Sequence, residues 1–383
     1  MNDNMRKFTI AFFFSSCLLG ATSGLAHMTF EGVKPATLDA TVKVSEPKFI
    51  YTPATHLTLV GKAADEGAHF HRVDTAKYNT MPAEVKKLFT NSSGLAISFV
   101  TNSTVIKARW TVPNRRQGGN MTPIMQKGLD LYIKRDGQWV YAGVGSPNGV
   151  TSNRTLVENM DSEEKECLLY LPLYDEITDL EIGVDRNAYL RKGVNPFKGK
   201  YVVYGSSITQ GASASRPGLA YPAQLSRSTG LNFINMGLSG NGKMEPEVGR
   251  MLVSIKNVDA FILDCVPNPS PDEIRERTVP FVKQLRKSHP KVPIIIIQSV
   301  VREKGNFNLK VRERVHQQNI AIAEQVKILQ NMGIKNLHFI KEDSFLGTDH
   351  EGSIDGDHPT DVGFERLLQK LKPALMEILG PHL

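Results

Sequence analysis

Residues 201–211 read YVVYGSSITQG, an apolar run that breaks into two serines and then a second glycine. Four further apolar segments follow at residues 232–239, 259–266, 292–300 and 337–343. Runs such as Ile294–Ile297 are typical of parallel strands that are covered on both faces. Strands that alternate with helical segments predict a parallel sheet whose ligands bind at the carboxyl ends of the strands.

Helical signals separate these strands. In the sequence SPDE, Ser270 supplies an N-cap, Pro271 the first helical position, and Glu273 the third residue after the cap. Further helices are predicted over about 309–331 and over 364–379. The fold class predicted for residues 196–383 is therefore α/β, a three-layer α/β/α domain with a flavodoxin-like parallel sheet.

Residues 27–195 show a different pattern, with short strands between polar turns. Alternating apolar residues flank Arg135-Asp136-Gly137, which predicts a β-hairpin. The sequence KYNTMPAEVKKLF (77–89) is the one short helical candidate. Several strands at this spacing indicate an N-terminal β-sandwich domain, jelly-roll-like in type.

The first 26 residues are expected to be a secretory signal peptide. Arg6 and Lys7 precede the apolar run FTIAFFFSSCLLGA, and small residues up to Ala26 suit cleavage there. Lipoprotein anchoring at Cys17 is the alternative, although Phe14, Ser15 and Ser16 make a poor lipidation signal. No later segment approaches the roughly 18 continuous apolar residues that a membrane span needs. We therefore expect an exported protein, periplasmic or secreted, without a stable membrane span.

Composition bounds the remaining classes. A chain of 383 residues with 40% hydrophobic content favours about two domains with their own cores. The formal net charge of +7 is spread without a basic run, so nucleic-acid binding is not expected. Cys167 and Cys265 fall in different predicted domains, so a disulfide framework is not expected either.

Small and polar residues follow four of the predicted strands. They are Ser206 and Ser207 after the first, Gly240 after the second, Asn268 after the third, and Asp355 and His358 in the loop after the last. A serine nucleophile needs a base, a carboxylate that orients the base, and donors for an oxyanion. His358 is the candidate base, and Asp355 can reach its other ring nitrogen from the same loop. Gly240 and Asn268 offer a backbone and an amide donor.

These blocks resemble the SGNH (GDSL-like) hydrolases, over about residues 198–380. GSSITQG is similar to the family's first block, LSGN to the second, PN to the third, and DGDHPTDVGF to the fifth, in the family's order. The sequence GLDLY (128–132) resembles the Gly-x-Asp-Leu-Tyr motif of the β-rich domain that precedes one bacterial branch of these enzymes. The resemblance implies Ser207 as nucleophile, His358 and Asp355 as its partners, and Gly240 and Asn268 in the oxyanion site.

Two departures from the family pattern concern this site. Ser206 stands where many members have aspartate, and Val266-Pro267-Asn268-Pro269 replaces Gly-x-Asn-Asp. Asp357 is the rival to Asp355, but the Asp-x-x-His spacing favours Asp355.

Other motifs fit the residues less well. Thr209 occupies the place where a nucleophile elbow requires glycine, and Gly211 is followed by Ala212 rather than by the lysine of a P-loop. The acidic and histidine residues of 349–358 lack regular metal-ligand spacing, so no metal or cofactor is expected. Two questions stay open: whether Asp130 and Tyr132 touch substrate or only hold the sandwich, and whether the tryptophans are core or sugar-stacking residues.

The expected function is that of an exported serine esterase, a carboxylic ester hydrolase. We expect short acyl groups, acetyl first, as the acyl part and a carbohydrate as the alcohol, either a small molecule or a polysaccharide. A carbohydrate-binding protein with an inactive hydrolase domain is the alternative from another class. A lysophospholipase or thioesterase is the alternative among enzymes. The oligomeric state stays open.

Overall fold

The structure is a computed structural model that describes residues 48–380. The expected signal peptide, Cys17 and the first part of the expected N-terminal domain lie outside the described residues. The described residues belong to one compact unit.

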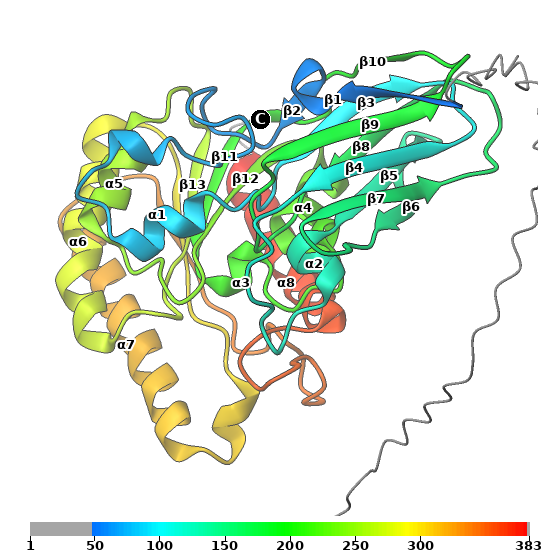
Figure 1. The fold of residues 1–383 in the computed structure, drawn as a ribbon. Helices are drawn as coiled ribbons and strands as arrows, with labels where there is room; N and C mark the ends of the chain where they lie inside the picture. Colours follow the sequence, from blue (N-terminus) through cyan, green and yellow to red (C-terminus); the bar gives the residue numbers. More distant parts are fainter. Residues whose placement is uncertain (1–47, 381–383) are drawn as a thin grey trace, which may run out of the picture. The chain divides into compact units, whose positions relative to one another are not determined.

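Two antiparallel sheets are built from the first half of the described chain. One contains, in order, β1 (Phe49–Pro53), β9 (Asp179–Asp185), β4 (Ile106–Thr111) and β7 (Thr151–Val157). The other contains β10 (Leu190–Lys192), β3 (Ala96–Thr101), β8 (Lys165–Tyr170), β5 (Leu129–Arg135) and β6 (Gln138–Gly145), with β2 (Thr58–Val60) beside β3. Apolar side chains from both sheets share one core, so the predicted β-sandwich is confirmed (Figure 1).

Side-chain alternation explains this packing. In β4, Ile106, Ala108 and Trp110 are buried in the shared core while their neighbours face outward. The indole of Trp110 donates to the carbonyl of Lys127 at 2.9 Å, so this tryptophan is a core residue. The predicted hairpin is also present, because β5 and β6 pair directly across a turn in which Asp136 and Gly137 both have positive φ.

The second half of the chain forms a five-stranded parallel sheet. Its order is β12 (Leu231–Gly237), β11 (Lys198–Gly205), β13 (Ala260–Asp264), β14 (Ile294–Ile297) and β15 (Leu337–Ile340). The main helices are α4 (Tyr221–Thr229), α5 (Pro246–Ser254), α6 (Pro271–Ser288), α7 (Leu309–Asn331) and α8 (Asp361–Leu379). The capping box predicted at Ser270 and Glu273 opens α6. The predicted α/β class is confirmed.

Helices cover both faces of this sheet. Alternate strand residues point to opposite sides: Val202 packs with α5, α6 and α7, whereas Val203 packs with α4 and α8. Figure 1 shows these two helical layers on either side of the sheet. Cys265 lies in the first of these cores, and Cys167 lies in the sandwich core. Within residues 48–380, no helix is long and apolar enough to cross a bilayer.

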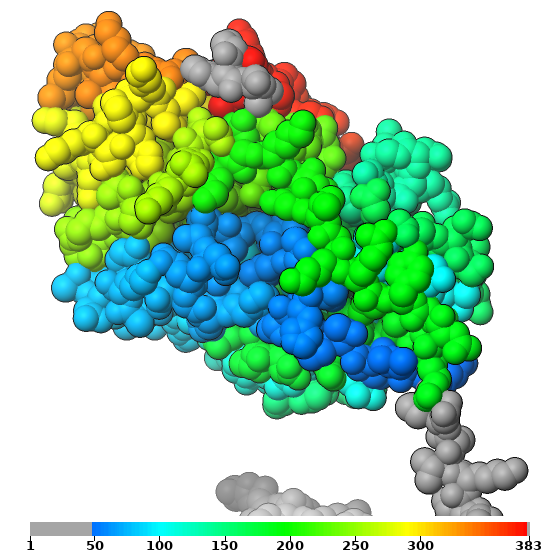
Figure 2. All heavy atoms as spheres, turned by 90° about the horizontal axis from the view of Figure 1, so that it is seen from above, coloured from blue at the N-terminus to red at the C-terminus, as the bar shows by residue number. Residues whose placement is uncertain are grey.

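One segment of the first half packs on the parallel sheet rather than on the sandwich. The helix predicted over 77–89 is shorter, α1 (Ala83–Phe89), and its residues Val85 and Phe89 join the core of α5 and α6. The buried Arg72 donates to the carbonyls of Asn235 and Gly237 at the end of β12. Figure 2 shows this blue segment lying against the yellow-green part of the chain. Arg72 in the first half of the chain therefore stabilises the carboxyl end of β12, which precedes Gly240.

Candidate active site

Two adjacent serines lie at the carboxyl end of β11 and have different environments. Ser206 is the N-cap of the short helix α3 (Ser207–Gln210), and its buried hydroxyl accepts a hydrogen bond from the Ile208 amide at 3.2 Å. Ser207 is the first residue of that helix and keeps a small exposed area. The hydroxyl of Ser206 thus serves the helix end, whereas that of Ser207 faces the loop after β15.

Ser207, His358 and Asp355 form a continuous chain of contacts. Ser207 Oγ lies 2.9 Å from His358 Nε2, and His358 Nδ1 lies 2.8 Å from Asp355 Oδ2. Both distances are within hydrogen-bond reach. The structure therefore brings Ser207 next to His358 and Asp355, although Ser207 precedes His358 by 151 positions.

The carboxylate of Asp355 is held in its charged form. Its Oδ1 accepts from the amides of Asp357, at 2.9 Å, and His358, at 2.8 Å. Burial acts to raise the pKa of Asp355, but the hydrogen bonds from the His358 ring and from these amides outweigh it and lower the pKa to about 2. A carboxylate that stays ionised can fix the tautomer of the neighbouring imidazole.

Asp357, the rival candidate, contacts two basic side chains. Its carboxylate pairs with Lys304 Nζ at 2.5 Å and lies 3.6 Å from Arg302 Nη1. These contacts tie the loop of His358 to the segment that precedes α7. Asp357 thus anchors this loop, while Asp355 contacts the imidazole.

Gly240 and Asn268 lie in neighbouring loops, after β12 and β13. Gly240 has φ of +68°, and a Cβ there would meet no atom within 4 Å. The amide of Asn268 donates to the carbonyl of Asn241, which joins the two loops. Among the described residues, no hydrogen bond links either Gly240 or Asn268 to Ser207.

A buried carboxylate contacts the short helix that begins at Ser207. Asp264 Oδ2 accepts from the hydroxyls of Thr209, at 2.7 Å, and Tyr221, at 2.9 Å. Burial raises the pKa of Asp264 to about 6, against the effect of these two hydrogen bonds. Gly205 is required here, because a Cβ would lie 2.0 Å from Thr209 Oγ1.

The GLDLY motif contacts the second half of the chain. Asp130 is fully buried and accepts from Arg216 Nη1 and, at 2.8 Å, from the amide of Gly218. The hydroxyl of Tyr132 accepts from the same guanidinium at 2.6 Å. These side chains therefore hold the segment that follows α3, in addition to their place in the sandwich.

Sequence reasoning missed one residue beside His358. Asn120, in the connection between β4 and α2 (Pro123–Lys127), lies 3.0 Å from Asp355 Oδ2 and 3.2 Å from His358 Nδ1 through its Nδ2. The surrounding sequence, Gly118-Gly119-Asn120, indicates only a turn, so no local signal identified it.

The acidic and histidine residues near His358 are engaged with other partners. Asp349 pairs with Arg366, and His350 contacts Glu303 at 2.9 Å. Within residues 48–380, no three His, Cys, Asp or Glu side chains are grouped to hold a metal ion.

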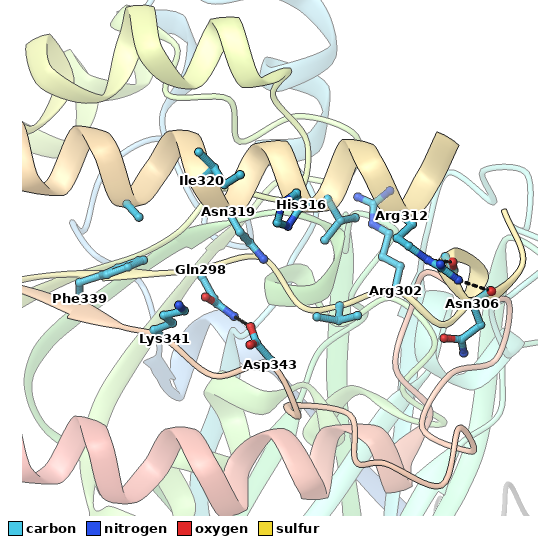
Figure 3. Close-up of a pocket in the computed structure, with 14 residues that line it drawn as sticks. Gln298, Arg302, Asn306, Arg312, His316, Asn319, Ile320, Phe339, Lys341 and Asp343 are labelled. Atoms are coloured by element: carbon cyan, nitrogen blue, oxygen red, sulfur yellow. Dashed lines mark hydrogen bonds between the residues drawn. The ribbon is translucent and has the colours of Figure 1, made fainter. Parts of the chain in front are cut away.

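A cavity of about 570 Å³ lies between α7 and the ends of β14 and β15 (Figure 3). Arg302, Asn319, Phe339 and Lys341 are among its lining residues, and Ser207 is not. Arg302 connects this cavity to the loop of Asn268, because it also donates to the carbonyl of Pro267 at 2.6 Å.

Comparisons with known proteins agree with this architecture. A model of the GDSL-like lipase/acylhydrolase family matches residues 198–376, and a model of the GxDLY domain, the N-terminus of SGNH-hydrolase-type esterases, matches residues 49–190. A protein of the GDSL-like lipase class from Bacteroides ovatus has a crystal structure with a TM-score of 0.86 and 67% identity, over 87% of this chain and 98% of that one. The chain therefore belongs to the GDSL-like lipase/acylhydrolase family, and it carries the GxDLY domain.

More distant structures share the fold. A salicylyl-acyltransferase from a tetracycline biosynthetic pathway has a TM-score of 0.67 at 19% identity, over 87% of this chain and 98% of that one. An acetyl xylan esterase from the rumen bacterium Butyrivibrio proteoclasticus has a TM-score of 0.55 at 14% identity, over 87% of this chain and 99% of that one. No curated protein sequence matches the chain.

Proposed function

We propose that the protein is a serine esterase that removes short acyl groups, acetyl first, from carbohydrates. The observation that carries this proposal is the 2.9 Å contact of Ser207 Oγ with His358 Nε2, continued at 2.8 Å to Asp355. A hydroxyl, a base and an orienting carboxylate in this order are the parts of a serine nucleophile.

The reaction proceeds through an acyl-enzyme. Ser207 Oγ attacks the ester carbonyl and forms a C–O bond, while its proton passes to His358 Nε2. The tetrahedral intermediate collapses when His358 returns that proton to the leaving alcohol. A water molecule then loses a proton to His358 and attacks the acyl carbonyl. His358 passes this proton to Ser207 Oγ as the C–O bond to the enzyme breaks, which releases the acid and restores Ser207. Asp355 stays ionised throughout, because its pKa of about 2 lies far below the working range.

The oxyanion would be stabilised by the loops that surround Ser207. The backbone amides of Ser207 and Gly240 and the side chain of Asn268 are the proposed donors. One amide hydrogen of Asn268 is used by the Asn241 carbonyl, which leaves the second for substrate. Loss of one oxyanion donor typically lowers the rate about 100- to 1,000-fold.

The carbohydrate substrate is supported by the expected export of the chain and by its fold. The acetyl xylan esterase shares that fold, although at 14% identity its specificity belongs to that protein alone. A second candidate, hydrolysis of a longer acyl ester, is favoured by one observation. Phe307 is 97% exposed in the segment before α7, and Lys304 of the same segment pairs with Asp357 in the loop of His358, so this apolar side chain lies in a segment joined to the proposed site.

Labelling and substrate panels test the proposal. The wild-type protein should react with a fluorophosphonate probe at Ser207, identified by peptide mass spectrometry, whereas Ser207→Ala should not react. Acetylated oligosaccharides and aryl esters from acetate to octanoate then rank the acyl chains, with an added alcohol acceptor to detect acyl transfer. Absence of labelling would favour the binding-protein alternative. A preference for octanoate would replace the carbohydrate acetyl esterase with the lysophospholipase or thioesterase alternative.

A further inference from the structure

The connection from β4 to α2 brings a residue of the sandwich to the proposed active site. Asn120 Nδ2 lies 3.0 Å from Asp355 Oδ2 and 3.2 Å from His358 Nδ1. This is a contact across the two halves of the chain, because Asn120 precedes Asp355 by 235 positions.

The chemistry of Asp355 fixes which way the Asn120 amide points. An ionised carboxylate only accepts hydrogen bonds, so the NH₂ group, and not the carbonyl oxygen, must face Oδ2. Oδ2 then receives Asn120 Nδ2 and His358 Nδ1, while Oδ1 receives the amides of Asp357 and His358. Asn120 thus supplies the fourth donor of a carboxylate that has about four acceptor positions.

The connection that carries Asn120 is held firmly at both of its ends. Arg115 donates its amide to Asp175 at 3.0 Å and its guanidinium to Glu176 at 3.0 Å. Thr122 donates to the carbonyl of Ser215, in the segment after α3, at 2.7 Å.

The side chain of Gln126 also holds the connection along its length, because it bonds the backbone of Arg115, Arg116 and Gly118. Asn120 therefore approaches Asp355 from a fixed position.

We propose that Asn120 is a positioning residue for the proposed esterase, acting through Asp355, and that the sandwich completes the active site by supplying it. This inference rests on the function proposed above. The Asn120 donor holds Asp355 Oδ2 at the distance and angle from which it receives His358 Nδ1–H. It also takes up part of the carboxylate's negative charge, which would otherwise favour the protonated, inactive imidazole.

Two substitutions separate donation from simple space filling. Asn120→Ala removes both the donor and the volume, whereas Asn120→Asp keeps the shape and replaces the donor with a carboxylate beside Asp355. If Asn120 acts as a donor, activity should fall from wild type to Asn120→Ala and further to Asn120→Asp. A space-filling role predicts that Asp resembles wild type and that Ala is the weakest.

The experiment is steady-state hydrolysis of an aryl acetate from about pH 4 to 9 by the full chain and its variants. Asn120→Ala should lower kcat about 10- to 100-fold with little change in KM, the range expected for a hydrogen bond to a charged group. The acid limb of its kcat/KM profile should move to higher pH, and further in Asn120→Asp. Gln117→Ala is the matched control, because its side chain bonds the Met121 carbonyl in the same connection and, among the contacts of residues 48–380, has none with Asp355 or His358. It should match wild type.

The outcomes distinguish this inference from the proposed function. If wild type is active, Ser207→Ala is inactive, and Asn120→Ala equals wild type in kcat and pH profile, the positioning role is wrong while the esterase proposal stands. If Asn120→Asp keeps full activity, the donor role is wrong. If wild type neither hydrolyses the ester nor reacts with the fluorophosphonate probe, both proposals fail together.

Discussion

Asp130 Oδ2 lies 2.8 Å from Arg216 Nη1 and joins the GLDLY motif of the sandwich to the segment that follows α3. The carboxylate is fully buried, and burial raises its pKa although Arg216 and the Gly218 amide act to lower it. Removal of one partner of a buried pair leaves the other charge without compensation. The motif therefore serves to hold the two halves of the chain together.

Asp130→Ala should lower the free energy of unfolding by about 3–5 kcal/mol, because Arg216 would stay partly buried without its partner. Urea unfolding followed by circular dichroism measures the loss. Glu166→Ala is the control, since it breaks the Lys134–Glu166 pair, in which Glu166 is 44% exposed, and should cost less than about 1 kcal/mol. Equal losses of unfolding free energy in the two variants would show that the Asp130–Arg216 contact does not stabilise the protein more than a surface ion pair.

Asp355→Asn should lower kcat about 1,000- to 10,000-fold and leave the fold intact, because an amide no longer selects the productive tautomer of His358. Wild type should show an acid limb of unit slope above about pH 4, since the pKa of Asp355 near 2 keeps this carboxylate ionised there. The pH dependence of kcat/KM measures both. A slope of two, or a loss below tenfold in the variant, would argue against this assignment.

Asp264→Asn should alter how stability depends on pH. Burial raises the pKa of Asp264 to about 6, above the value of about 3.9 in the unfolded chain, so the folded state binds this proton more tightly. Wild-type stability should then fall as pH rises from about 4 to 6 and stay lower above 6. Between pH 4 and 8 the variant should gain about 2 kcal/mol relative to wild type, measured by urea unfolding. If the unfolding free energies of wild type and Asp264→Asn change in parallel with pH, Asp264 does not have a raised pKa in the folded state.

Gly240→Ala and Gly242→Ala should differ in their effects on stability and on catalysis. Both glycines have positive φ, but a Cβ on Gly240 enters open space, whereas one on Gly242 would lie 2.2 Å from the carbonyl oxygen of Gly205. Gly242→Ala should therefore cost about 3 kcal/mol of stability or more. Gly240→Ala should cost about 1 kcal/mol. If Gly240 belongs to the proposed oxyanion site, its methyl group would enter the space for the ester and lower kcat/KM about 10- to 100-fold. Thermal unfolding and kinetics separate the two effects, and an unchanged kcat/KM in Gly240→Ala would remove Gly240 from the site.

The parts of the fold that sequence predicts are those with local causes. The Asp136-Gly137 turn, the capping box at Ser270 and the apolar run Ile294–Ile297 each specify their own structure. The convergence of Ser207 and His358 also follows from the sequence, because parallel strands bring their carboxyl ends to one edge.

Long-range partners had no such signal. Nothing near Arg216 or Asn120 indicates a partner that lies 86 or 235 positions away. The shorter α1 has a local reason that was overlooked, since Pro82 disfavours helical geometry in the residue before it. Its packing on the parallel sheet depends on tertiary contacts of Val85 and Phe89, which periodicity alone does not reveal.

The most direct test compares aryl acetate hydrolysis by wild type, Ser207→Ala and Ser206→Ala. Ser207→Ala should lose about 1,000-fold or more of kcat, because among residues 48–380 no other hydroxyl contacts the His358 ring. Ser206→Ala should lose about 1 kcal/mol of stability, through the missing cap to Ile208, and keep kcat within about tenfold. Equal rates in all three proteins, or loss of turnover in Ser206→Ala alone, would contradict Ser207 as the nucleophile.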